Sequence, residues 1–132
     1  MTIQDKTLKV CNCNNTIALD AQALGAALKL GGPIRIHTEL CRRDAAGFQG
    51  ALSDPTVIVA CTQEAALFTE LASAAESKAE LRFVNIRETA GWSKDAKAAG
   101  PKMAALIAVA AEPTPEPPFV TFNSDGVILI YG

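Results

Sequence analysis

The chain has 132 residues, of which 49% are hydrophobic and 20% charged, and this composition is that of one globular domain rather than a disordered segment. The formal net charge of −2 argues against a nucleic-acid surface, because phosphate binding requires a basic excess. The longest apolar run, 103–111, is too short to span a membrane, and no apolar leader opens the chain. We therefore expect a cytoplasmic protein whose cysteines stay reduced.

Short apolar runs alternate with alanine-rich amphipathic stretches, a pattern typical of a parallel sheet covered by helices. The predicted strands are 8–10, 34–37, 56–60 and 81–85. The predicted helices are 21–30, 45–52, 63–75 and a long one from Ser93 towards Ala111, which Pro101 either breaks or restarts. This order predicts an α/β three-layer sandwich with a mostly parallel sheet, flavodoxin-like strand order 2-1-3-4 and helices on both faces.

The sequence changes character after residue 111. Residues 1–111 form the predicted cysteine-bearing α/β domain, and 112–118 form a stiff proline-rich linker. Segments 119–122 and 127–131 read as strands that could pair as a hairpin. Because an apolar strand followed by glycine begins many α/β units, we expect 119–132 to start the next domain of a longer protein.

The four cysteines follow successive predicted strands. Cys11 and Cys13 lie after the first strand, Cys41 lies in the loop after the second, and Cys61 ends the third. In the order 2-1-3-4 the two flanking strand ends lie about 10 Å apart with the first strand between them, because neighbouring strands are about 4.8 Å apart. All four thiols are therefore predicted at the carboxyl edge of the sheet, where open α/β sheets bind ligands.

Thiolates are soft ligands, and four of them select zinc or an iron–sulfur cluster. A one-residue spacing plus two remote single cysteines resembles the paired knuckles of structural zinc sites poorly, whereas a cluster accepts ligands from separate loops. A cluster, a zinc ion and a metal-free site all remain open on these residues. Asn12 and Asn14 fit a tight loop that aims amide N–H groups at cluster sulfurs, and equally fit an ordinary turn.

Several motifs together resemble the N-terminal domain of the heterodisulfide reductase A family. They are the C-x-C at 11–13, Leu40-Cys41, the V-I-V-A-C that ends at Cys61, and the N-I-R-E at 85–88 with Trp92 nearby. Residues 102–110 also resemble the closing helix of that family, so the resemblance covers most of the chain up to Ala111.

This resemblance implies a 4Fe–4S module of a larger electron-transfer protein, ferredoxin-like in role, with all four cysteines as ligands. It also implies ferredoxin-type and flavin-binding domains on the same polypeptide, and a separate redox partner protein. The chain departs from the family pattern, which reads C-H-C-G-G-N where this chain has 11–16, and which often has a cysteine at the position of Ala90.

Two rival functions fit parts of the sequence. In a thiol enzyme, Cys61 ahead of a helix would have a lowered pKa and Arg42, Arg43 or Arg87 would hold an anion, but the single histidine, His37, offers no convincing base. In a zinc-bound or metal-free interaction domain, the cysteines would be structural and the domain would dock the rest of a redox protein.

Overall fold

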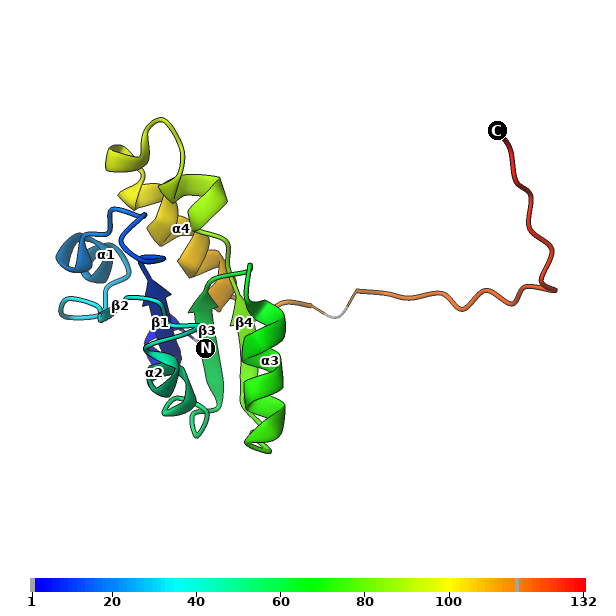
Figure 1. Cartoon of the computed structure of the whole chain (residues 1–132), viewed down its shortest axis with the longest axis horizontal. Helices are drawn as coiled ribbons and strands as arrows, with labels where there is room; N and C mark the ends of the chain where they lie inside the picture. The colour runs from blue at the N-terminus through cyan, green and yellow to red at the C-terminus, as the bar shows by residue number, and fades with distance from the viewer. Residues whose placement is uncertain (1, 116) are drawn as a thin grey trace.

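The structure, a computed structural model, describes residues 2–115 and 117–132 and contains one four-stranded, all-parallel sheet in the order β2-β1-β3-β4 (Figure 1). The strands are β1 (Thr7–Cys11), β2 (Ile36–His37), β3 (Thr56–Ala60) and β4 (Glu80–Phe83). The longer helices are α1 (Ala21–Ala27), α2 (Ala45–Gln49), α3 (Ala65–Ala74) and α4 (Gly100–Ala111). The α/β class and the strand order expected from the sequence are confirmed.

The side chains of the central strand β3 pack against helices on both faces of the sheet. Its three middle residues, Val57 to Val59, are completely buried, and successive side chains of a strand point to opposite faces. Ile58 packs in one apolar cluster with residues of α1 and α4, whereas Val57 and Val59 pack in a second cluster with Phe48 of α2 and Phe68 of α3. The sheet is therefore the middle of three layers.

The segment between β4 and α4 differs from the expected long helix. It forms a π-helical turn, η2 (Arg87–Gly91), and a 3-10 turn, η3 (Ala96–Ala98), before α4 begins at Gly100. Pro101 lies in the first turn of α4, where its missing N–H costs nothing. The expectation of a helix starting at Ser93 is therefore wrong, and Pro101 marks the start of the helix. A third short turn, η1 (Ile3–Asp5), precedes β1.

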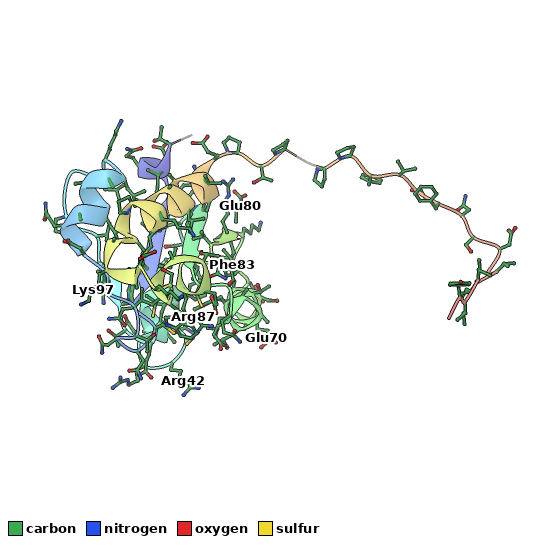
Figure 2. The ribbon with its side chains drawn as sticks, turned by 90° about the horizontal axis from the view of Figure 1, so that it is seen from above. Arg42, Glu70, Glu80, Phe83, Arg87 and Lys97 are labelled. Carbon is green, nitrogen blue, oxygen red and sulfur yellow. The ribbon has the colours of Figure 1, made fainter. Side chains whose placement is uncertain are left out.

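Beyond α4 the chain leaves the α/β body as an extended segment (Figures 1 and 2). Residues 117–132 contain no helix or strand, and their large apolar side chains are exposed. The strands expected at 119–122 and 127–131 are thus not formed, because a strand needs a hydrogen-bonded neighbour and the described part of the chain offers this segment none. Glu116 of the expected linker lies outside the described residues. Within the described residues, no helix is both long and apolar enough to cross a bilayer.

Arg82 of β4 connects the C-terminal end of α4 to the sheet through hydrogen bonds. Its guanidinium Nη1 donates hydrogen bonds to the carbonyl oxygens of Ala110, Ala111 and Glu112, at 3.2, 3.2 and 2.7 Å. The last carbonyls of a helix have no partner within the helix, so a cation here satisfies them and complements the helix dipole.

We expect Arg82→Met to lower the free energy of unfolding by about 1–2 kcal/mol, because the carbonyls lose a charged donor. Urea denaturation followed by circular dichroism measures this loss. Arg43→Met is the matched control, because Arg43 is largely exposed and its salt bridge within the described residues is a surface pair with Glu39, so its loss should cost well under about 1 kcal/mol. Equal stability of the two variants would contradict the assigned role of Arg82.

Candidate functional site

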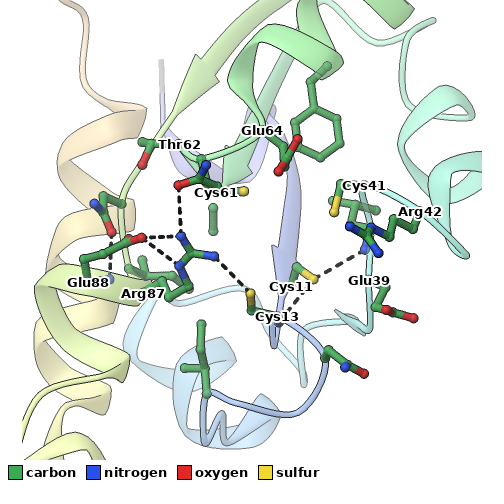
Figure 3. A pocket seen from close by; sticks show the side chains of 18 residues that line it. Cys11, Cys13, Glu39, Cys41, Arg42, Cys61, Thr62, Glu64, Arg87 and Glu88 are labelled. Atoms are coloured by element: carbon green, nitrogen blue, oxygen red, sulfur yellow. Dashed lines mark hydrogen bonds and ion pairs between the residues drawn. The ribbon is translucent and has the colours of Figure 1, made fainter.

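A cavity of about 280 Å³ lies at the carboxyl edge of the sheet and is lined by all four cysteines. Cys11 ends β1, Cys13 follows it, Cys41 comes from the loop after β2, and Cys61 follows β3. Figure 3 shows the four thiol groups directed into the same space from these three strand ends. The structure therefore brings together the residues that the strand order predicts to meet.

Cys11 is the most buried of the four cysteines. It is 8% exposed, belongs to the apolar cluster on the α2/α3 face, and pairs with His37 in the ladder between β1 and β2. Its Sγ accepts hydrogen bonds from the backbone N–H groups of Cys13 and Leu40, both at 3.4 Å. Two amides from two different loops thus point at one sulfur, which is how proteins stabilise a thiolate or a metal-bound sulfur.

The loop after Cys11 turns through an unusual backbone. Cys13, Asn14 and Asn15 have φ values of 49°, 57° and 62°, all in the left-handed region. Asparagine tolerates this region, but for cysteine it is uncommon, and such conformations persist only where surrounding contacts hold them. The turn carries the Cys13 side chain back over the end of the strand and into the cavity.

Asn12 and Asn14 have different places in this loop. The Asn12 side chain donates to Asn15 Oδ1 at 2.9 Å and to Thr38 Oγ1 at 3.0 Å, and its Oδ1 accepts from the Asn15 N–H at 3.0 Å. It therefore braces the loop from within and does not line the cavity, whereas Asn14 does. A direct contact with a ligand is open to Asn14 and not to the Asn12 side chain.

Burial raises the pKa of both Cys61 and Cys41, and nearby Glu64 adds to the rise at Cys41. Backbone N–H groups at Glu64 and Gln63 favour the Cys61 thiolate, but desolvation outweighs them. The lowered pKa that a thiol enzyme requires at Cys61 is therefore not found. These two thiols carry their protons at neutral pH unless a cation replaces them.

His37, the single histidine, stands outside the cavity. Its ring is buried, its Nδ1 pairs with the Asp44 carboxylate, and its Nε2 has no hydrogen-bond partner among the described residues. It packs tightly beneath α2, where a Cβ added at Gly47 would lie 2.9 Å from the ring Cε1. The histidine is thus a structural residue of this face and neither a base nor a ligand for the cysteine cavity.

Arg87 is expected from the sequence only as an anion-holding residue of a thiol enzyme, whereas in the structure it contacts the cysteine loop. Arg87 Nε donates to the neighbouring Glu88 Oε1 at 2.8 Å. The same guanidinium also donates to Cys13 Sγ at 3.3 Å and to Gln63 Oε1 at 3.2 Å (Figure 3). Both longer contacts join distant segments, so spacing along the chain carries no signal for them.

The segment that carries Arg87 docks closely on the cysteine loop. Trp92 Nε1 donates to Thr16 Oγ1 at 3.1 Å, and a Cβ built at Gly91 would lie only 2.4 Å from Cγ2 of buried Ile17. Glycine is required at position 91 by this approach rather than by its backbone angles. Trp92 itself is 53% exposed, and its indole ring lies against the Arg87 guanidinium.

The four thiols that line the cavity are soft donors, which suit a zinc ion or an iron–sulfur cluster. A tetrahedral zinc ion with Zn–S bonds of about 2.3 Å needs its sulfurs within about 3.8 Å of one another. In the described residues, no three histidine, cysteine or acidic side chains approach closely enough to hold a single metal ion. The hydrogen bonds to Cys11 and Cys13 are N–H···S contacts of the kind found at iron–sulfur sites.

Comparison with known proteins gives no relative from which a role could be transferred: no family model, curated protein or solved structure matches the chain. The likeness to the N-terminal domain of heterodisulfide reductase A therefore remains a prediction from the motifs.

We expect Gly91→Ala to destabilise the protein by about 1–3 kcal/mol, because the new methyl group overlaps Ile17. Ile17→Ala alone also destabilises, through the cavity that it leaves. In the double variant the two defects should partly cancel, so its loss in urea denaturation should be smaller than the sum of the single losses. Additive losses would show that the two segments are not in contact.

We expect Cys61 in the metal-free, reduced protein to react with iodoacetamide more slowly at pH 8 than a cysteine in the same protein unfolded in urea. Its raised pKa leaves less thiolate at this pH, so the rate should climb as the pH rises further. Peptide mass spectrometry after timed quenching gives the rate for each cysteine. Rapid, selective alkylation of Cys61 at neutral pH would instead favour the thiol enzyme.

Proposed function

We propose that the chain is an electron-transfer module that holds a 4Fe–4S cluster on Cys11, Cys13, Cys41 and Cys61. The observation that carries the proposal is that four cysteine side chains from three strand ends line one cavity, with N–H donors directed at two of the sulfurs. Thiolates select soft metals, and the extent of the cavity favours a cluster over a single ion.

The surroundings of the cavity suit electron transfer better than catalysis. Cys41 and Cys61 are protonated when no metal is bound, which disfavours them as nucleophiles, and the buried histidine lies outside the cavity. A cluster at this edge of the sheet would exchange one electron at a time with its partners, and no bond in the protein needs to form or break.

The partners we propose are other domains of the same polypeptide, ferredoxin-type or flavin-binding, together with a separate redox protein. The cytoplasm is the proposed compartment, because thiols stay reduced there and clusters are protected from oxidation. Within the described chain the exposed apolar residues between Phe119 and Tyr131 lie outside the α/β body, where a neighbouring domain could cover them.

Anaerobic reconstitution with ferrous iron and sulfide tests the proposal. We expect a brown protein with about four iron and four sulfide per chain, whose visible absorption bleaches with dithionite. Changing any one of the four cysteines to serine should reduce cluster content or stability markedly. Thr62→Ala is the matched control, because Thr62 lines the same cavity without a metal-binding group, and it should load like the unaltered protein.

Two results would count against the cluster. Stoichiometric zinc in a colourless protein would support a zinc-stapled interaction domain, with the same cysteines in a structural role. Failure of every metal to bind under anaerobic, reducing conditions would leave a metal-free domain.

A further inference from the structure

We propose that Arg87 is the positioning residue of the cysteine site: it holds the Cys13 side chain in the cavity and favours the reduced state of the bound cluster. The second half rests on the function proposed above, and the first half does not. The inference is carried by the contacts of one guanidinium group that joins three segments of the chain at the cavity wall.

Every nitrogen of the Arg87 guanidinium donates a hydrogen bond. Nη1 donates to Cys13 Sγ at 3.3 Å, Nη2 donates to Gln63 Oε1 at 3.2 Å, and Nε donates to Glu88 at 2.8 Å. Gln63 lies two residues beyond Cys61, so the fork of Arg87 connects the loop after β1 with the loop after β3. The Arg87 side chain is 19% exposed, and its hydrogen bond to Cys13 is partly buried.

Trp92 fixes the guanidinium from its other side. The centre of the Arg87 guanidinium lies 4.3 Å from the centroid of the indole ring, which is the geometry of a cation–π contact. The same indole donates to Thr16 in the cysteine loop, as described above. A half-exposed tryptophan at this position is thereby explained, because it clamps Arg87 to the loop that carries Cys13.

Cys13 is the cysteine with most need of such a contact. Cys41 and Cys61 also follow their strands, but of these three only Cys13 has a left-handed backbone, with a φ of 49°. Loops of this kind are held by their surroundings rather than by their own preferences. The Arg87–Cys13 hydrogen bond reaches the sulfur itself, so it fixes the direction of the side chain as well as the loop.

The same contact has a redox consequence. Reduction adds one electron to a thiolate-bound cluster, and a cation or N–H donor at a ligand sulfur stabilises the added negative charge. Arg87 brings both, so it should raise the reduction potential. Glu88 brings a carboxylate to the same guanidinium and partly offsets this effect.

The test compares Arg87→Met with Arg42→Met in the full chain after anaerobic reconstitution. Both arginines line the cavity, but Arg42 is exposed and donates no side-chain hydrogen bond within the described residues. We expect Arg87→Met to shift the potential of the cluster to lower values in a mediated dithionite titration. Arg42→Met removes a charge from the same cavity without removing a hydrogen bond to a sulfur, so it should lower the potential less than Arg87→Met does.

Two further variants separate charge from geometry. Arg87→Lys keeps the charge but cannot reach three partners with one ammonium group, so its potential should fall between that of the unaltered protein and that of Arg87→Met. Glu88→Gln removes the offsetting carboxylate while the Arg87 contact to Cys13 stays, so its potential should rise. Equal potentials for Arg87→Met and the unaltered protein, at equal iron and sulfide content, would overturn the redox half of the proposal.

The positioning half is measured in the metal-free protein by amide hydrogen exchange. Arg87→Met should speed exchange in the peptide that covers residues 12–17 and leave α3 unchanged, whereas Arg42→Met should alter neither. Unchanged exchange in 12–17 would overturn the positioning role. If the unaltered protein takes up no cluster while Arg87→Met still loosens this loop, the proposed function fails, the redox half fails with it, and the positioning role stands.

Discussion

The parallel pairing of β1 with both β2 and β3 is the constraint on which the rest of the structure depends. Because three neighbouring strands run in the same direction, their carboxyl ends meet at one edge of the sheet, and the residues that follow them are brought together whatever their separation in sequence. Cys11, Cys41 and Cys61 need no loop of special length to meet there. An antiparallel placement of either flanking strand would send its cysteine to the opposite edge, about a strand length away.

Cys13 is the one cysteine that the sheet alone does not place. Cys11 belongs to the apolar cluster on the α2/α3 face, whereas Cys13 packs against the cluster on the α1/α4 face. The left-handed turn after β1 brings the two thiols to the same cavity across the end of the strand. The tight seating of Gly91 on Ile17 and the Arg87 contact then hold that turn from the side of η2. Strain in the loop is thus balanced by packing from a segment that is distant in the sequence.

Features that depend on the sheet could be predicted from the sequence, whereas features that depend on packing between distant segments could not. The four strands of the sheet, their order and the meeting of the cysteines were predictable because they depend on hydrophobic patterning and on a general property of parallel sheets. The course of 87–99 was not, because the periodicity of 93–111 reads as one helix while Pro101 and docking on the cysteine loop decide where α4 begins. The contact between Arg87 and Cys13 could not be predicted for a similar reason. Pairing with the adjacent Glu88 is enough to explain a charged residue at position 87, and the contact with Cys13, which is distant in the sequence, exists only in the folded chain.

The raised pKa values of Cys41 and Cys61 suit metal ligands better than nucleophiles. A nucleophile must be a thiolate before its substrate arrives, so burial without a compensating cation works against it. A metal ligand need only lose its proton when the metal binds, and metal uptake releases that proton to solvent. The burial that disfavours a bare thiolate also weakens screening, so it strengthens the attraction between thiolate and metal once both are present. Desolvated thiols, N–H donors at Cys11 and a guanidinium at Cys13 are therefore consistent with one another as parts of the proposed metal-binding cavity, and the desolvation argues against Cys61 as the nucleophile of a thiol enzyme.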